Sequence, residues 1–289
     1  MTRAFVLSGG ASLGASQVGM ARVLREEGIN PELIVGSSVG AVNGAWLASG
    51  RSPDELADVW RSMRRQDLFP TRLPLGLRAF LGRSSHYVPD AGLRRLIEQH
   101  VSFSWLEDAP IPLAIVATEV PSGAEVVLQR GPTVDAILAS AALPAIFPPV
   151  TIDGRVLIDG GVVNNTPITT AIELGATEVW VLSTGSSCAL PGPPTSALAM
   201  AMHAVGLMVQ RRLALEIAVR DYDVPVHLIP PPCPIDVSPI DFSKTAELID
   251  GAATATRQWL AAGQPDSMHL LAPHVHSRHG SELPHLTQR

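Results

Sequence analysis

Two adjacent serines occupy a pattern typical of serine hydrolases. The residues Gly36-Ser37-Ser38-Val39-Gly40 match G-x-S-x-G, between an apolar run and a segment that favours a helix. In such a turn, small neighbours leave room for a strained serine whose hydroxyl points outward at the positive end of the helix. Ser38 is therefore the predicted nucleophile, and Ser37 is the second candidate. Either serine could instead be an ordinary helix N-cap.

A glycine-rich loop precedes this pattern by one strand–helix unit. Residues 8–15 read S-G-G-A-S-L-G-A, and small residues at the start of a helix expose backbone N–H groups to an anion. The glycine order is not G-x-G-x-x-G and no lysine follows as in a P-loop, so nucleotide binding is not indicated. We predict an oxyanion hole formed by Gly9, Gly10 and Ala11, with Gly14 supporting the loop.

The candidate base is Asp159, which is followed by Gly160 and Gly161 and preceded by the apolar residues 156–158. Taken alone, this tripeptide is more typical of a simple turn. An aspartate with its ordinary pKa of about 3.9 is a poor base unless it is desolvated and aimed at the hydroxyl. The apolar residues before Asp159 and the glycines after it permit both conditions.

A histidine base is the alternative. His203 and His227 both follow Asp159 in the chain, as the order serine, acid, histidine of the α/β-hydrolases requires. However, His203 falls within an apolar helical pattern and His227 within a strand pattern, and neither lies in a loop after a strand. Both positions are more typical of structural histidines, so the sequence favours Asp159.

Alternating strand and helix patterns surround these candidate residues and must position them. Strands are predicted at residues 5–7, 33–35, 111–118, 125–128, 156–158, 178–182 and 226–229. Helices are predicted at residues 17–26, 39–48, from Ser52 onward, at 134–142, 168–174, in a long segment ending at Arg220, and at 243–262. This alternation predicts an α/β fold, a three-layer sandwich with a mostly parallel central sheet, in one domain over residues 1–262.

Composition narrows the classes of function. The chain has 289 residues, 46% of them hydrophobic, which allows a large buried core. Its net charge of -6, without a long basic run, argues against nucleic acid as a partner. Cys188 and Cys233 share no zinc-type spacing, so we predict no metal and no cofactor. Because no signal peptide or apolar run of about 20 residues is visible, a cytoplasmic location is expected.

Two segments lack periodicity. Residues 69–89 are rich in Pro, Gly and Arg and suit a lid; within them, residues 73–81 combine apolar side chains with arginine. That combination fits peripheral membrane contact, or equally a hydrophobic lid packed on the core. Residues 263–289 are rich in His, Ser, Pro and Gln and are predicted to be disordered. A metal-binding tract is less favoured there, because the histidines have no regularly spaced acidic or cysteine partners.

Taken together, the motifs resemble those of the patatin-like phospholipases, in particular the compact bacterial single-domain members. The likeness extends over residues 4–262 and includes S-A-A-L-P-A-I-F-P-P at 140–149 and V-V-N-N-T-P at 162–167. The resemblance implies a patatin-like fold, a Ser38–Asp159 dyad, a covalent acyl-enzyme and a lipid ester substrate. Ala11 and Leu13 depart from the family, whose loop has a third glycine and a basic residue there. A positive charge near the oxyanion is thereby lost.

The sequence therefore predicts a serine acyl hydrolase for lipid esters, similar to phospholipase A or lysophospholipase. A non-catalytic lipid- or acyl-binding regulator on the same fold is the alternative, and Leu13 favours it. An acyltransferase would use the same serine with an alcohol in place of water. Head group, acyl chain length and oligomeric state are left open.

Overall fold

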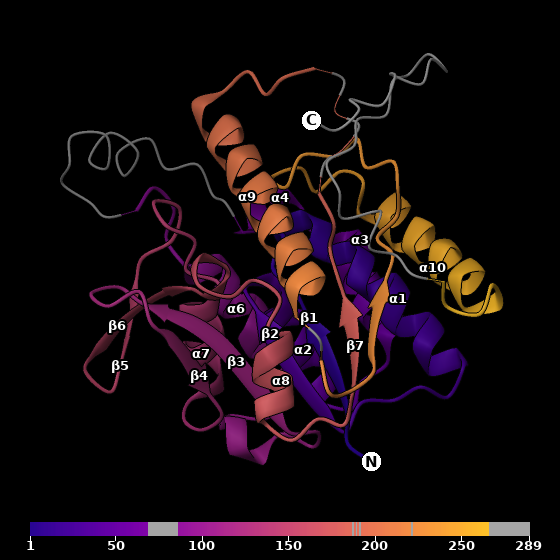
Figure 1. Ribbon diagram of the computed structural model, residues 1–289. Helices are drawn as coiled ribbons and strands as arrows, with labels where there is room; N and C mark the ends of the chain where they lie inside the picture. Colours follow the sequence, from indigo (N-terminus) through magenta and orange to yellow (C-terminus); the bar gives the residue numbers. More distant parts are fainter. Residues whose placement is uncertain (69–85, 187, 189, 191, 221, 266–289) are drawn as a thin grey trace.

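The fold is a mixed β-sheet covered by helices on both faces (Figure 1). The computed structural model describes residues 1–68, 86–186, 188, 190, 192–220 and 222–265. Within them the sheet has eight strands in the order β5-β6-β3-β2-β1-β7-β8, and β4 also pairs with β3. The strands are β1 (Arg3–Leu7), β2 (Leu33–Ser37), β3 (Leu113–Glu119), β4 (Glu125–Leu128), β5 (Val150–Ile152), β6 (Arg155–Asp159), β7 (Glu178–Leu182) and β8 (Val226–Ile229).

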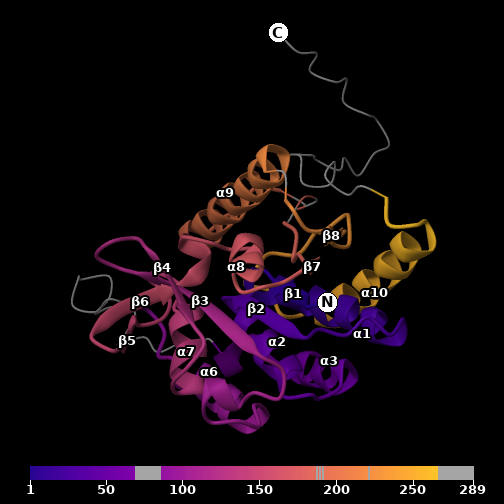
Figure 2. The same ribbon diagram turned by 60° about the horizontal axis from the view of Figure 1, so that its bottom comes forward.

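The helices form two outer layers. They are α1 (Ala15–Glu26), α2 (Val39–Ala48), α3 (Pro53–Ser62), α4 (Arg65–Leu68), α6 (Ala91–His100), α7 (Thr133–Ser140), α8 (Ile168–Glu173), α9 (Ala197–Val219) and α10 (Thr245–Ala261). Short 3₁₀ turns are η1 (Ala11–Gly14), η2 (Leu106–Asp108) and η3 (Gly160–Val162). Figure 2 shows α8 and α9 on one side of the strands and α1, α2, α3 and α6 on the other. The predicted α/β class, with a sheet between helical layers, is confirmed.

The central strands are apolar on both faces, because helices cover both. Leu7 on β1, Ile34 on β2 and Ile115 on β3 belong to the larger core, beneath α1, α2 and α3. Val6 and Val35 point the other way, into a second core under α8 and α9. Five neighbouring strands, β3-β2-β1-β7-β8, are parallel, as continuous apolar runs of this kind predict.

Helix α3 illustrates how local sequence fixes an element. The Ser52 hydroxyl accepts a hydrogen bond from the Asp54 N–H at 3.1 Å, and the Glu55 carboxylate accepts one from the Ser52 N–H at 3.2 Å. This capping box, with Pro53 at the first turn, starts the helix as the sequence predicted. Its buried face then carries Trp60 toward the core.

Strands β2 and β6 meet end to end along the same side of β3. Val116 of β3 pairs with Ser37 of β2, and Ala117, the next residue, pairs with Asp159 of β6. Strand β4 occupies the other side of β3 at both positions. Because β6 runs antiparallel to β3 while β2 runs parallel to it, the carboxyl ends of β2 and β6 face each other. The sequence predicted both strands but not this opposition.

Some expectations concern residues beyond this description. The membrane or lid segment 73–81 and the tail from residue 266 lie outside the described residues, so they stay predictions, as does the domain limit at residue 262. In the described part of the chain, no helix has the length and apolar character to cross a bilayer. Over the same residues, no group of three or more His, Cys, Asp or Glu side chains is arranged to hold a metal ion.

Candidate active site

Ser38 lies in the sharp turn between β2 and α2, with φ 55° and ψ −124°. A non-glycine residue in this region is strained by roughly 1–3 kcal/mol and persists only where its surroundings hold it. Here the Ser38 N–H donates to the Ser140 hydroxyl at 2.9 Å, and that hydroxyl donates to the Val116 carbonyl at 2.6 Å. The turn is thus tied to α7 and β3.

The glycines of the pattern permit close packing of backbone on backbone. A Cβ on Gly40 would lie 2.1 Å from the Leu7 carbonyl oxygen, and one on Gly36 would lie 2.5 Å from the Gly40 carbonyl oxygen. The first turn of α2 therefore rests directly on β1 and β2. Ser37, the second candidate, is fully buried, and its hydroxyl has no hydrogen-bond partner among the described residues.

Asp159 receives the hydrogen bond that the Ser38 hydroxyl donates, at 2.6 Å between Oγ and Oδ2. Its other carboxylate oxygen accepts the Gly161 N–H at 2.7 Å. The side chain is buried, and this desolvation raises the pKa of Asp159 from 3.8 to about 6, against the opposing effect of the two hydrogen bonds. Gly160 permits the approach to β3, since a Cβ there would lie 2.1 Å from the Val116 carbonyl oxygen.

The glycine-rich loop borders Ser38, and its amides differ in their use. A Cβ built on Gly9 would lie 3.0 Å from Ser38 Cβ, so the two backbones are close. The Gly9 N–H donates to the Asn165 carbonyl at 3.1 Å, whereas the N–H groups of Gly10 and Ala11 donate to nothing within the described part of the chain. The backbone of Ala11 has φ 51°, in the left-handed region. At the end of the loop, a Cβ on Gly14 would lie 2.6 Å from the Val39 side chain, so the loop packs closely against α2.

Of the two histidines considered as alternative bases, His203 lies on helix α9 and His227 on strand β8. His227 Nε2 lies 3.3 Å from the Glu178 carboxylate, and its ring stacks on Trp180 with centroids 4.3 Å apart. Among the described residues, the Asp159 carboxylate accepts hydrogen bonds from the Ser38 hydroxyl and the Gly161 backbone N–H and from no histidine. Within the described part of the chain, no imidazole therefore joins the serine and the carboxylate.

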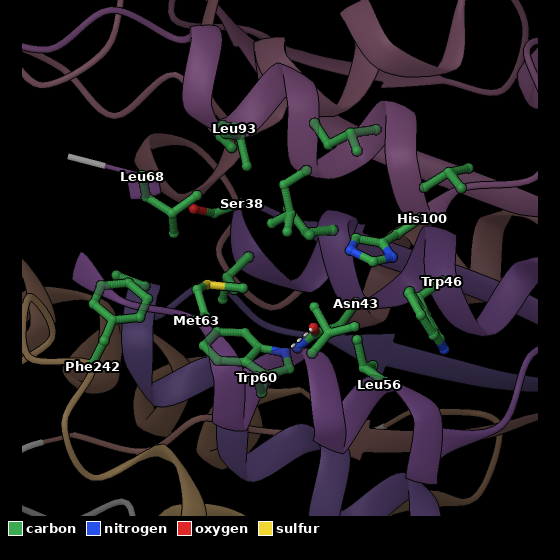
Figure 3. A pocket seen from close by; sticks show the side chains of 18 of the residues that line it. Ser38, Asn43, Trp46, Leu56, Trp60, Met63, Leu68, Leu93, His100 and Phe242 are labelled. Carbon is green, nitrogen blue, oxygen red and sulfur yellow. Dashed lines mark hydrogen bonds between the residues drawn. The ribbon is translucent and has the colours of Figure 1, made fainter. Parts of the chain in front are cut away.

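An apolar pocket opens beside Ser38 (Figure 3). Its polar side chains are those of Ser38, Asn43 and His100 and the two indoles. The lining is Ala11, Ser38, Val39, Val42, Asn43, Trp46, Leu56, Val59, Trp60, Met63, Leu68, Leu93, Leu96, Ile97, His100, Val101, Ala141, Leu143, Phe147 and Phe242. Burial, together with the nearby Arg51 charge, lowers the pKa of His100, which favours the neutral ring. The apolar lining of the pocket is chemically complementary to a long hydrocarbon chain.

Sequence reasoning missed much of this pocket. Helix α6 was not predicted, although Leu93, Leu96 and Ile97 have the spacing of an apolar helical face. That face, together with His100, forms one wall of the pocket. This apolar spacing is visible in the sequence, but it follows directly after the irregular segment 69–89 and was not recognised as a helix.

The arrangement contains what acyl transfer to a serine requires. A hydroxyl is hydrogen-bonded to a carboxylate whose pKa is raised to about 6, so that the carboxylate can accept a proton near neutral pH. Backbone N–H groups without an acceptor among the described residues lie next to it, and an apolar pocket opens beside it.

Comparison with known proteins gives a consistent result. Residues 5–172 match the family model for patatin-like phospholipase. The chain is 35% identical over 165 residues to an uncharacterised NTE family protein of Mycobacterium tuberculosis, covering 57% of this chain and 44% of that protein. It is 30% identical over 190 residues to human patatin-like phospholipase domain-containing protein 6, covering 64% of this chain and 13% of that one. The chain thus spans less than half the length of these curated relatives.

The fold also has a counterpart among solved structures. VipD from Legionella pneumophila superposes with a TM-score of 0.50 at 14% sequence identity, over 90% of this chain and 67% of that chain. At this identity the likeness concerns the fold alone.

Proposed function

This chain belongs to the patatin-like phospholipase family, and we propose that it is a serine acyl hydrolase that cleaves carboxylic esters of lipids. The observation that carries the proposal is the 2.6 Å hydrogen bond from Ser38 to the buried Asp159, beside an apolar pocket. The two residues act as a dyad, in which no histidine of the described ranges contacts the Asp159 carboxylate.

In the first half-reaction the Ser38 Oγ attacks the ester carbonyl carbon while Asp159 accepts the hydroxyl proton. The carbonyl oxygen becomes an oxyanion, the carbon–oxygen bond to the alcohol breaks, and the leaving alcohol takes the proton from Asp159. Water then gives a proton to Asp159 and attacks the acyl-enzyme. Collapse releases the fatty acid and returns the proton to Ser38.

Gly10 and Ala11 are the proposed oxyanion donors, because their N–H groups are not used elsewhere in the described residues. Gly9, expected as a third donor, gives its N–H to Asn165; its proposed contribution is the close approach of the loop to Ser38. Leu13, at the family's basic position, is buried in the larger core. Oxyanion stabilisation then depends on backbone dipoles, each worth on the order of 100-fold or more in rate.

The test is hydrolysis of a p-nitrophenyl acyl ester. We expect Ser38→Ala and Asp159→Asn each to lower kcat by roughly 1000-fold or more, since each removes a member of a unit that acts together. Ser37→Ala is the matched control: it deletes the neighbouring hydroxyl, and activity should persist. A fluorophosphonate should label Ser38. Activity retained in Ser38→Ala, or a label on Ser37, would contradict the dyad.

A non-catalytic acyl-binding regulator is the second candidate, favoured by the apolar pocket and by Leu13. Its signature would be saturable fatty-acid binding without phosphonate labelling of Ser38. An acyltransferase would instead be labelled and would form a new ester when an acceptor alcohol is added. Product analysis with and without the acceptor separates these outcomes.

Membrane contact through residues 73–81 remains a prediction, because the segment lies outside the described residues. Cosedimentation with lipid vesicles should be weaker for a variant that lacks residues 73–81 than for the full chain. Equal cosedimentation would contradict this contact.

A further inference from the structure

Two buried amide side chains hold both ends of the glycine-rich loop. The Gln17 Nε2 group donates to the Ser8 carbonyl at 2.8 Å and to the Leu182 carbonyl at 3.0 Å. The Asn43 Nδ2 group donates to the Gly14 carbonyl at 2.9 Å and to the Gln17 Oε1 at 2.9 Å. Ser8 and Gly14 are the first and last residues between β1 and α1, the segment that contains Gly10 and Ala11. Asn43 and Gln17 are each only 1% exposed.

The third member of this network is Trp60. Its indole N–H donates to Asn43 Oδ1 at 3.0 Å, which Figure 3 shows at the wall of the pocket that Ser38 also lines. The Trp60 ring is stacked with Phe242, with centroids 6.2 Å apart and planes 9° apart. With this bond, both amide protons and the carbonyl oxygen of each amide side chain in the network have partners.

A network of this kind has a consequence for catalysis. The loop is rich in small residues, and Ala11 has the strained φ of 51°, so its local sequence does not fix one conformation. A buried network in which every group is paired is rigid, and losing one partner loosens the rest. Oxyanion donors are effective only when their positions are set before the reaction.

We infer that Asn43 and Gln17 are positioning residues for the oxyanion loop, and that Trp60 makes their arrangement responsive to the acyl chain in the pocket. The inference rests on the proposed function. It assigns to Trp60 a role in rate as well as in packing. A long acyl chain against the Trp60 ring holds the indole, the indole holds Asn43, and Asn43 holds the loop.

Trp46 provides the matched control. It lines the same pocket, is equally buried at 3% exposure, and its indole N–H donates to the Ser52 carbonyl at 3.1 Å, away from the loop. Trp60→Phe and Trp46→Phe therefore remove the same atoms and one indole hydrogen bond each, which is buried for Trp60 and partly buried for Trp46. The Trp46 variant measures the effect of an altered pocket wall. Only the Trp60 variant leaves the side-chain oxygen Oδ1 of Asn43 without its hydrogen-bond donor.

The experiment measures kcat and KM for p-nitrophenyl acetate, butyrate and octanoate, together with the rate of fluorophosphonate labelling. We expect kcat for octanoate to be roughly tenfold lower in Trp60→Phe than in Trp46→Phe, with similar KM, because loop placement rather than binding is affected. The rise of kcat with chain length in the wild type should be lost in Trp60→Phe. A merely structural tryptophan would scale kcat for all three esters alike.

Equal kcat values and equal chain-length dependence in the two variants would overturn the inference while leaving the hydrolase intact. A wild type that neither hydrolyses the esters nor takes the label would overturn the proposed function, and this inference with it. If thermal melting shows that Trp60→Phe does not fold, kcat of the Gln17→Met variant tests the positioning role instead. This variant alters the loop support outside the pocket and should lower kcat for every ester; an unchanged kcat would again refute the positioning role.

Discussion

At the scale of single residues, the proposed role of Asp159 as base requires a carboxylate that is ionised although it is buried. Desolvation raises its pKa to about 6, and the Ser38 and Gly161 hydrogen bonds counter only part of that effect. The proton-accepting form is the carboxylate, so the proposed reaction and the stability of the fold depend on pH in opposite directions.

Activity should follow the ionisation of Asp159. We expect kcat/KM to be level above about pH 7 and to fall about tenfold per unit below about pH 6, because the protonated acid cannot accept the Ser38 proton. The measurement is a pH–rate profile in the wild type and in His100→Ala. A level profile down to about pH 4.5, or an acid limb that disappears with His100, would contradict Asp159 as the base.

Stability should change in the other direction. Since the folded pKa of about 6 exceeds the unfolded value of 3.8, the favourable contribution of Asp159 is complete below pH 3.8 and is lost as the pH rises through about 6. Asp159→Asn avoids this loss. Its gain in unfolding free energy over the wild type should be about 2 kcal/mol larger at about pH 8 than at about pH 4.5. Denaturant unfolding at both pH values measures the difference; an equal gain would contradict the raised pKa.

At the scale of elements, the turn that carries Ser38 depends on α2 lying against β1. Gly40→Ala should cost about 2 kcal/mol or more, since its Cβ would meet the Leu7 carbonyl at 2.1 Å and backbone cannot yield cheaply. A Cβ on Gly206, inside α9, would meet no atom within 4 Å among the described residues. Gly206→Ala should therefore raise the free energy of unfolding by roughly 0.5–1 kcal/mol. Urea unfolding compares the two; similar effects would contradict the packing argument.

The sequence predicted elements better than their arrangement. The apolar runs at 33–35 and 178–182 predicted strands of the parallel sheet, because a strand buried on both faces is apolar throughout. Ser52 and Pro53 predicted the start of α3, because helix capping depends on local sequence. Local pattern carries no information on strand direction, so the antiparallel entry of β6 was not predicted. The G-x-S-x-G and D-G-G motifs identified candidate residues. The network of Gln17, Asn43 and Trp60 was not predicted, because its hydrogen bonds join residues that are far apart in the chain.

At the scale of the whole molecule, the sheet divides the protein into two unlike halves. The pocket lies on the side of α2, α3 and α6, and α8 and α9 pack on the other. Substrate selection should therefore depend on the first side. We expect kcat/KM to rise by about fourfold per methylene from acetate to octanoate, as burial of a methylene is worth about 0.8 kcal/mol. Val59→Trp, which narrows the pocket, should abolish the gain for octanoate and spare acetate; loss for both esters would contradict the assignment.

The end-to-end meeting of β2 and β6 on β3 has a further consequence. Strand β6 belongs to a short hairpin with β5 at the margin of the sheet, where side chains such as Val156 are exposed. Such margins open more readily than a parallel centre. Detachment of this hairpin would carry Asp159 away from Ser38 while the inner strands kept their hydrogen bonds. Warming should then extinguish turnover before the circular dichroism of the backbone changes, and cooling should restore it.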